Sequence, residues 1–139
     1  MRHVFVYGTL RSGEINDIAC AAARHRIDAP HWIGSATVSG RLYDFGAYPG
    51  LVPDAGGPVR GEVYAIDDTL VPVLDEIEEI YPGVDSLFQS SEVIVALGGG
   101  EVLCLLYVVA GDSVQGLPRI ESGDWVLHRL ARDVEPAID

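Results

Sequence analysis

The stretch Val-Phe-Val-Tyr-Gly-Thr-Leu-Arg-Ser-Gly, residues 4–13, carries the strongest structural signal in the chain. Its first four residues favour a β-strand, and Gly8 then permits a turn through Thr9 and Leu10 toward a segment with helical spacing. Such a turn leaves backbone N–H groups and the Thr9 hydroxyl without obligatory partners, so they could bind a carboxylate or a developing oxyanion. A glycine after a strand is also a common ordinary turn, so this stretch alone leaves both interpretations open.

Composition limits the class of protein. The chain has 139 residues, 48% of them hydrophobic, which suits one compact domain with a substantial core. Its formal net charge is −12, from 21 acidic residues against nine Lys plus Arg, and no basic patch offsets it. This charge repels phosphate backbones and anionic lipids, so we expect neither nucleic acid nor membrane as a partner. The composition is compatible with a monomer or a homodimer.

The ends of the chain and its cysteines indicate the compartment. Met1 is followed at once by the first expected strand, and no apolar run approaches the roughly 20 residues of a membrane span, so we expect a cytoplasmic protein. Cys20 and Cys104 are far apart, each among apolar neighbours. This pattern predicts two reduced thiols in the core rather than a disulfide or a metal site.

No motif in the sequence calls for a metal or a cofactor. The four histidines show neither H-x-H nor H-E-x-x-H spacing, so no metal site is expected. The segment 111–116 fails the G-x-S-x-G spacing of a hydrolase elbow. Residues 98–100 are three glycines that precede a strand instead of a helix, so they match neither a P-loop nor a dinucleotide fingerprint.

Hydrophobic periodicity predicts a mixture of strands and helices without a strict β-α-β rhythm. This arrangement favours an α+β domain whose mixed sheet curls into a small β-barrel flanked by helices. The expected elements after the first strand are a helix over Glu14–Arg24, two strand segments within 32–45 that break at Ser39-Gly40, a strand over Val59–Ile66, a helix that starts near Asp67–Thr69, a hairpin of Glu92–Leu97 with Glu101–Ala110, and a weak helix over about 124–134.

The second expected helix carries four acidic residues and no basic one. On an ideal helical wheel, Glu78 lies about 90° from the centre of the apolar face, Glu76 about 110°, and Asp75 and Glu79 near the opposite side. All four could simply solvate an exposed face. If Glu78 instead turns inward, burial and nearby negative charges raise its pKa, which makes a carboxylate a useful proton shuttle near neutral pH.

Six short motifs, in order and together spanning residues 4–125, resemble the γ-glutamylcyclotransferase-like family, also called AIG2-like. Each motif is short, but their shared order and spacing make the resemblance specific. The motifs are Val6-Tyr7-Gly8-Thr9-Leu10-Arg11-Ser12-Gly13, Gly40-Arg41-Leu42-Tyr43-Asp44, Tyr48-Pro49-Gly50-Leu51-Val52, Val59-Arg60-Gly61-Glu62-Val63-Tyr64, Leu74-Asp75-Glu76-Ile77-Glu78 and Ser122-Gly123-Asp124-Trp125.

The resemblance implies a reaction and assigns residues to it. It implies that the loop of Tyr7, Gly8, Thr9 and Leu10 binds a γ-glutamyl group and that Glu78 is the general acid and base. The implied reaction is intramolecular: the substrate's α-amino group attacks its own γ-carbonyl and releases 5-oxoproline and a free amine, without metal or cofactor. Tyr7 could equally be a packing residue, and Arg11 could meet a substrate anion or lie in solvent.

The chain also departs from the family pattern. The family often continues after its glutamate with Gly-Tyr and later an aromatic residue followed by arginine. This chain has Glu79-Ile80-Tyr81 and then Phe88-Gln89-Ser90, so a pocket arginine is missing and the substrate can differ. A non-catalytic module that binds a small molecule or a partner is therefore the alternative function, and a hydrolase that activates water with Glu78 is a third.

Overall fold

The computed structural model describes residues 2–54, 56–78 and 87–133, and its elements alternate irregularly between strands and helices. Two short 3-10 helices, η1 (Asp68–Leu70) and η2 (Gly111–Val114), connect larger elements. The strands are β1 (Arg2–Val6), β2 (His31–Ser39), β3 (Arg41–Asp44), β4 (Pro49–Val52), β5 (Pro58–Ile66), β6 (Phe88–Leu97) and β7 (Gly100–Val109), and the α-helices are α1 (Ile18–Arg24), α2 (Val71–Ile77) and α3 (Trp125–Asp133).

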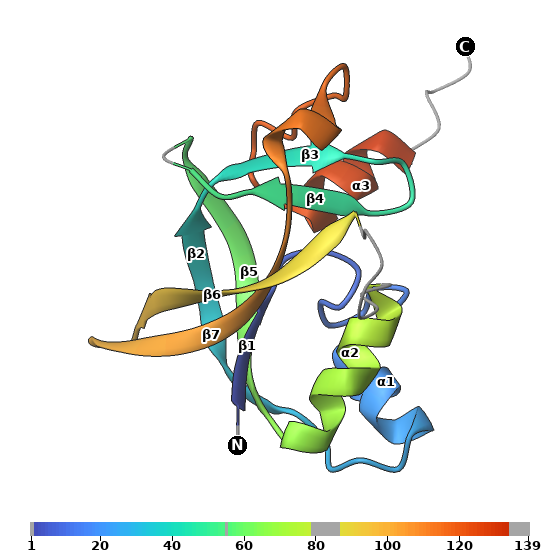
Figure 1. Cartoon of the computed structure of the whole chain (residues 1–139), viewed down its shortest axis with the longest axis vertical. Coiled ribbons are helices and arrows are strands. Elements are labelled where there is room, and N and C mark those ends of the chain that lie inside the picture. The colour runs from blue at the N-terminus through green and yellow to red at the C-terminus, as the bar shows by residue number, and fades with distance from the viewer. Residues whose placement is uncertain (1, 55, 79–86, 134–139) are drawn as a thin grey trace.

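Strand β1 is the centre of a five-stranded mixed sheet with the order β2-β5-β1-β7-β6. It pairs antiparallel with β5 and parallel with β7. The sheet curls into a half-barrel, with β6 turning back toward β2, and the β3–β4 hairpin lies across one end (Figure 1). The expected α+β class and mixed, curled sheet are confirmed, and the loop after β1 emerges from the middle of the sheet.

Side chains of β1 alternate between two hydrophobic clusters, as the twofold periodicity of a strand requires. Val4 and Val6 pack in the cluster that also holds residues of α1 and α2. Phe5 and Tyr7 pack in the other cluster, together with Trp125 of α3. Both faces of β1 are therefore buried, and β5 and β7 pair with its two edges, so the position of the following loop is fixed at its start.

Two local expectations differ from the structure. Helix α1 begins at Ile18 and not near Glu14, because Asp17 caps it by accepting a hydrogen bond from the Ala19 N–H at 2.9 Å. The strand β4 was not expected, because Tyr48-Pro49-Gly50 has the composition of a turn. Its pairing with β3 and its complete burial supply the stabilisation that local propensity lacks.

The two cysteines lie in different surroundings. Cys104 is buried in β7, as expected, but Cys20 is exposed on α1. The prediction of two core thiols is therefore wrong for Cys20, because the buried face of α1 is formed by Ile18, Ala21 and Ala22. Among the described residues, no helix has both the length and the apolar character needed to cross a bilayer.

Gly61 lies in β5 where that strand crosses the end of β1. A methyl group at this position would meet the Val6 carbonyl oxygen and would lie 2.8 Å from Cε2 of the Phe5 ring. Both neighbours belong to the buried strand and cannot move aside cheaply. Gly61 therefore permits the close approach of β5 that fixes the start of the loop.

We expect Gly61→Ala to lower the free energy of unfolding by about 2 kcal/mol, because overpacking at this site displaces β1. The control is Gly100→Ala in β7, where the nearest atom to an added methyl group is the Leu97 carbonyl oxygen at 3.9 Å. That change should stay within about 0.5 kcal/mol. Urea unfolding of both variants checks the prediction, and equal stabilities would contradict it.

Candidate active site

In the loop after β1, the residues Gly8, Thr9 and Leu10 use their carbonyl groups and their N–H groups differently. The Gly8, Thr9 and Leu10 carbonyls accept hydrogen bonds from the N–H groups of residues 11, 16 and 18 at 2.9–3.0 Å. The N–H groups of Gly8, Thr9 and Leu10 have no acceptor among the described residues. Adjacent N–H groups without acceptors are the kind of donors with which a loop can bind an anion, so the anion-binding role of this loop stays a prediction.

Close packing places this loop against β4. A methyl group on Gly8 would lie 2.6 Å from Cγ of Pro49, so only glycine fits here without movement. The Thr9 hydroxyl oxygen accepts a hydrogen bond from the Asn16 side chain at 3.1 Å, which leaves its own proton available to a ligand. The Leu10 side chain is buried, so this residue can offer a ligand only its backbone.

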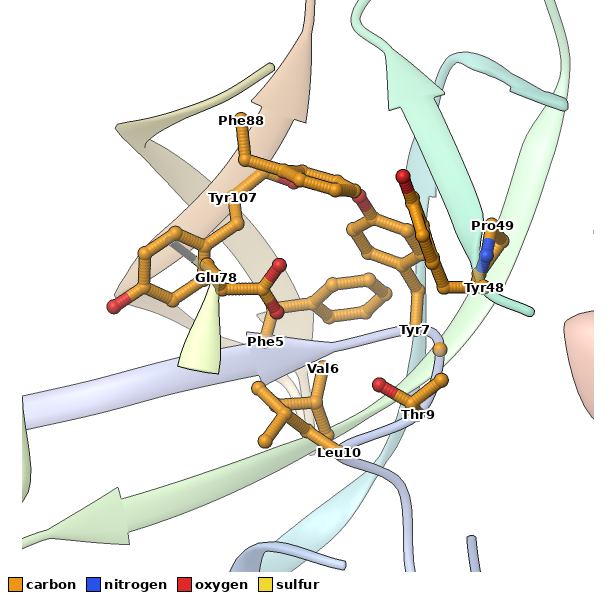
Figure 2. A pocket seen from close by; sticks show the side chains of 11 residues that line it. Phe5, Val6, Tyr7, Thr9, Leu10, Tyr48, Pro49, Glu78, Phe88 and Tyr107 are labelled. Carbon is orange, nitrogen blue, oxygen red and sulfur yellow. The ribbon is translucent and has the colours of Figure 1, made fainter. Parts of the chain in front are cut away.

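A pocket lies between this loop, the end of α2, the residues Tyr48 and Pro49 at the start of β4, and aromatic residues of β6 and β7. The pocket is small and opens to solvent. Figure 2 shows the Glu78 carboxylate directed into this space, toward the ring of Tyr7. The lining residues are Phe5, Val6, Tyr7, Gly8, Thr9, Leu10, Tyr48, Pro49, Glu78, Phe88 and Tyr107.

Glu78 is the acidic residue in this lining. It directly follows α2, and its N–H donates to the Leu74 carbonyl at 2.9 Å. The side chain is half-buried, and its carboxylate has no hydrogen bond or ion pair with another described residue. Burial raises the pKa of Glu78 from its ordinary 4.5 to about 7, so the group can both take up and release a proton near neutrality.

The helical wheel predicted the position of Asp75 incorrectly and that of Glu76 correctly. It placed Asp75 on the solvent side, yet the Tyr107 hydroxyl donates to Asp75 Oδ1 at 2.6 Å. A wheel omits such long partner side chains, and it does not describe Glu78, which lies just beyond the last helical residue. Glu76 is exposed, as expected of a solvating residue. Glu79 and Tyr81 lie outside the described residues.

Tyr7 contributes its ring to the pocket, while its hydroxyl is used by the fold. The hydroxyl donates to the Tyr107 carbonyl at 2.7 Å and accepts from the Leu51 N–H at 3.2 Å. Burial, followed by the nearby Glu78 charge, raises the pKa of Tyr7. A substrate would therefore contact the face of a neutral ring that joins β1, β4 and β7.

An aromatic wall that sequence reasoning had not singled out stands across the pocket from Glu78 (Figure 2). Tyr48 stacks on Phe45 at 5.5 Å between ring centroids and meets Phe88 at 5.6 Å. The Tyr48-Pro49-Gly50 motif is the sequence signal for this wall, but its composition indicates only a turn. Gln89, at the position where the family often has arginine, is exposed.

Arg11 turns away from the pocket into a buried ion-pair network, so it neither faces a substrate nor lies in solvent. Its guanidinium donates to Glu62 Oε2 at 3.1 Å and to Asp124 Oδ1 at 2.9 Å. Sequence reasoning missed Glu62 and Asp124 as partners, although both lie in the quoted motifs. No Lys, Arg or His is found among the described residues that line the pocket.

Within the described ranges, no group of three or more His, Cys, Asp or Glu side chains is placed to hold a metal ion. The chemistry available in the pocket is thus that of one carboxylate, a set of N–H donors, a hydroxyl and aromatic rings. Such a set can move a proton, hold an anionic group and exclude water.

Residues 4–127 match the family model described as "Gamma-glutamyl cyclotransferase, AIG2-like". The chain is 34% identical over 133 residues to gamma-L-glutamyl-butirosin B gamma-glutamyl cyclotransferase of Niallia circulans, covering 94% of this chain and 79% of the relative. It is 32% identical over 123 residues to gamma-glutamylaminecyclotransferase of Bos taurus, covering 77% of this chain and 65% of the relative. The crystal structure of an AIG2-like protein from Mus musculus has a TM-score of 0.72 at 28% identity, covering 87% and 86% of the two chains.

The raised pKa of Glu78 should make stability depend on pH. Between about pH 4.5 and 7 the folded protein binds a proton that the unfolded chain has released, so the free energy of unfolding falls as pH rises through this range. Above pH 7 the ionised, buried carboxylate lowers the free energy of unfolding by up to about 3 kcal/mol. Glu78→Gln should remove this penalty, because the amide does not ionise. The stability of the variant relative to the parent should therefore increase between about pH 5 and pH 8. Urea unfolding of both proteins at pH 5 and pH 8 checks this prediction. The same difference in free energy of unfolding at the two pH values would contradict it.

Proposed function

The chain belongs to the AIG2-like γ-glutamyl cyclotransferase family, and we propose that it converts a γ-glutamyl amine or amide to 5-oxoproline and a free amine. The observation that supports this proposal best is that a carboxylate with a pKa of about 7 and a run of free N–H groups line the same pocket. Cyclisation requires a proton acceptor and an anion-binding group within reach of one small substrate.

Glu78 is the proton carrier in this proposal. The ionised carboxylate takes a proton from the substrate's α-ammonium group, and the amine then attacks the γ-carbonyl carbon. As the bond between that carbon and the leaving nitrogen breaks, Glu78 gives its proton to the leaving nitrogen. The ring nitrogen loses a second proton on closure, and this proton also ends on the leaving amine, which departs as an ammonium ion. No proton is gained or lost overall, and acid-base help of this kind is typically worth about 10²- to 10⁴-fold in rate.

The free N–H groups of Gly8, Thr9 and Leu10 hold the α-carboxylate of the substrate. The described lining supplies no basic side chain for this negative charge, and Arg11 is bound to Glu62 and Asp124. Backbone N–H donors, with the Thr9 hydroxyl, are therefore the groups left to bind it. This placement puts the α-amine, which is attached to the same carbon, beside Glu78.

The rings around the pocket favour the folded substrate that cyclisation needs. Tyr7, Tyr107 and Phe5 bound the space that Glu78 enters. A glutamyl group confined there brings its amine close to its own γ-carbonyl, and pre-orientation of this kind removes much of the entropic part of the barrier.

Tyr48 and Phe88 lie where the leaving amine would emerge. Their ring faces attract cations, and the net charge of −12 favours a cationic amine over an anionic one. The exposed Gln89 in place of arginine removes a charge that would favour an anionic leaving group. We therefore propose an amine-bearing leaving group, in keeping with the names of the relatives from Niallia circulans and Bos taurus.

Products separate the proposed reaction from its alternatives. The protein should release 5-oxoproline and amine in equal amounts from at least one member of a panel of γ-glutamyl amines, measured by chromatography with mass detection. Release of glutamate would instead indicate a hydrolase. Binding of a panel member without any product would indicate a non-catalytic module, and either result would overturn the proposal.

Glu78→Gln should lower turnover by about a hundredfold or more, because the amide cannot accept the α-ammonium proton. Substrate binding, measured by calorimetry, should persist because the N–H groups of the loop are unchanged. Glu76→Gln, an exposed neighbour on α2, is the matched control and should keep activity within about twofold. Full turnover in the Glu78 variant would remove the role assigned to this residue.

The pH profile gives a separate test of the same residue. Because only ionised Glu78 can accept the proton, kcat/KM should rise with pH and level off above an apparent pKa of about 7. Initial rates between about pH 5 and pH 9 would show this limb. A limb that lies near the ordinary carboxyl value of 4.5 would contradict burial of the working carboxylate.

A further inference from the structure

We propose that Glu62, which lies outside the pocket, is a positioning residue that holds the substrate-binding loop in its working conformation. This inference rests on the proposed function of that loop. Glu62 is the buried charged residue among those described, with 7% of its surface exposed, and it does not belong to the pocket lining. Its effect on the substrate would pass through Arg11 and Ser12.

The Glu62 carboxylate binds the two residues that follow the free N–H groups. Its Oε2 accepts from Nε of Arg11 at 3.1 Å, and its Oε1 accepts from the Ser12 N–H at 2.9 Å. Oε1 also accepts from the Tyr64 hydroxyl at 2.9 Å. Both oxygens are thus satisfied, and two of the three bonds reach the loop.

The network continues to the start of α3. The second nitrogen of the Arg11 guanidinium donates to Asp124 Oδ1 at 2.9 Å, and the same oxygen accepts from the Leu127 N–H of α3 at 3.1 Å. The Arg11 side chain is therefore held between β5 and the start of α3, with 11% of its surface exposed. These bonds hold the guanidinium away from the pocket.

This anchoring compensates for a weakness of the loop itself. The N–H groups of Gly8 to Leu10 make no bond to the described residues, so their direction depends on the bonds that hold the surrounding loop, including those that the Gly8, Thr9 and Leu10 carbonyls accept. They lie between two fixed ends: Val6 in β1, whose Cα pairs with that of Glu62, and residues 11–12, which the Glu62 carboxylate binds. One residue of β5 thus determines both ends of the segment that would bind the substrate.

Stability alone is a poor explanation for this arrangement. A buried ion pair often gains little over a hydrophobic replacement, because removing both charges from water is costly. Preorganised N–H donors, in contrast, lose binding strength quickly when their direction is not fixed. If the loop holds the α-carboxylate in the ground state and the transition state alike, loss of the anchor should appear in KM.

The test is Glu62→Gln, which keeps the size of the side chain but removes its charge. KM for the γ-glutamyl substrate should rise about tenfold or more, as expected for weakened bonds to a charged group. We expect kcat to stay within about threefold and the limb of the pH profile assigned to Glu78 to keep its position. Arg11→Gln removes the same ion pair from the loop side, so it should raise KM similarly, and the double variant should add little.

Asp44→Asn is the matched control. The Asp44 side chain has 10% of its surface exposed against 9% for Glu62, and it pairs with Arg132 and His128 of α3 away from the pocket. This variant should lose stability but keep KM within about twofold. An equal rise of KM in Asp44→Asn, or an unchanged KM in both Glu62→Gln and Arg11→Gln, would overturn the proposal.

A measurement without turnover separates this inference from the proposed reaction. Backbone ¹⁵N order parameters of Gly8, Thr9 and Leu10 should fall in Glu62→Gln and Arg11→Gln but not in Asp44→Asn. If the parent protein produces no 5-oxoproline, the reaction is wrong, while the order parameters still test the anchor. Unchanged order parameters in the two anchor variants would show that Glu62 does not position the loop.

Discussion

Removal of the Glu78 carboxylate from water is the constraint on which the site depends. The carboxylate enters a pocket lined by aromatic rings and backbone, where no described residue satisfies it, and burial raises its pKa to about 7. An unpaired acid in such surroundings is costly for folding. The cost can be tolerated because α2 is anchored through Leu70 and Leu74, which belong to the same buried cluster as Val4 and Val6 of β1.

Two acidic residues near the loop have opposite environments. Glu78 is half-buried and unpaired among the described residues, while Glu62 is buried and bound by Arg11, the Ser12 N–H and the Tyr64 hydroxyl. The first arrangement favours exchange of a proton near neutral pH, and the second supplies hydrogen-bond acceptors that hold the loop in place. The same side-chain type therefore suits a chemical role at one position and an architectural role at another.

Sequence reasoning identified the strand-loop pattern, the acidic residue with the strongest claim to chemistry and the family. It succeeded where information is local or where the order of motifs is specific, as for the turn at Gly8 and the hairpin of β6 and β7. Gly8 and Glu78 line one pocket, and their roles there stay predictions. It failed for Arg11, Asp75 and Cys20, whose surroundings come from elements distant in the sequence. It also missed β4, because a Tyr-Pro-Gly sequence favours a turn until pairing with β3 and burial stabilise a strand.

The sequence by itself determined that the chain is an α+β protein of this family with a glycine turn after its first strand, because periodicity, turn chemistry and motif order are written in neighbouring residues. Only the tertiary structure decided which groups meet. The β3–β4 hairpin packs Pro49 against Gly8, and β6 contributes Phe88 to the same pocket. The end of α2 directs Glu78 inward, and β5 places Glu62 against Arg11 and Ser12. Burial, and with it the pKa of a carboxylate, depends on these distant neighbours, so no local pattern specifies it.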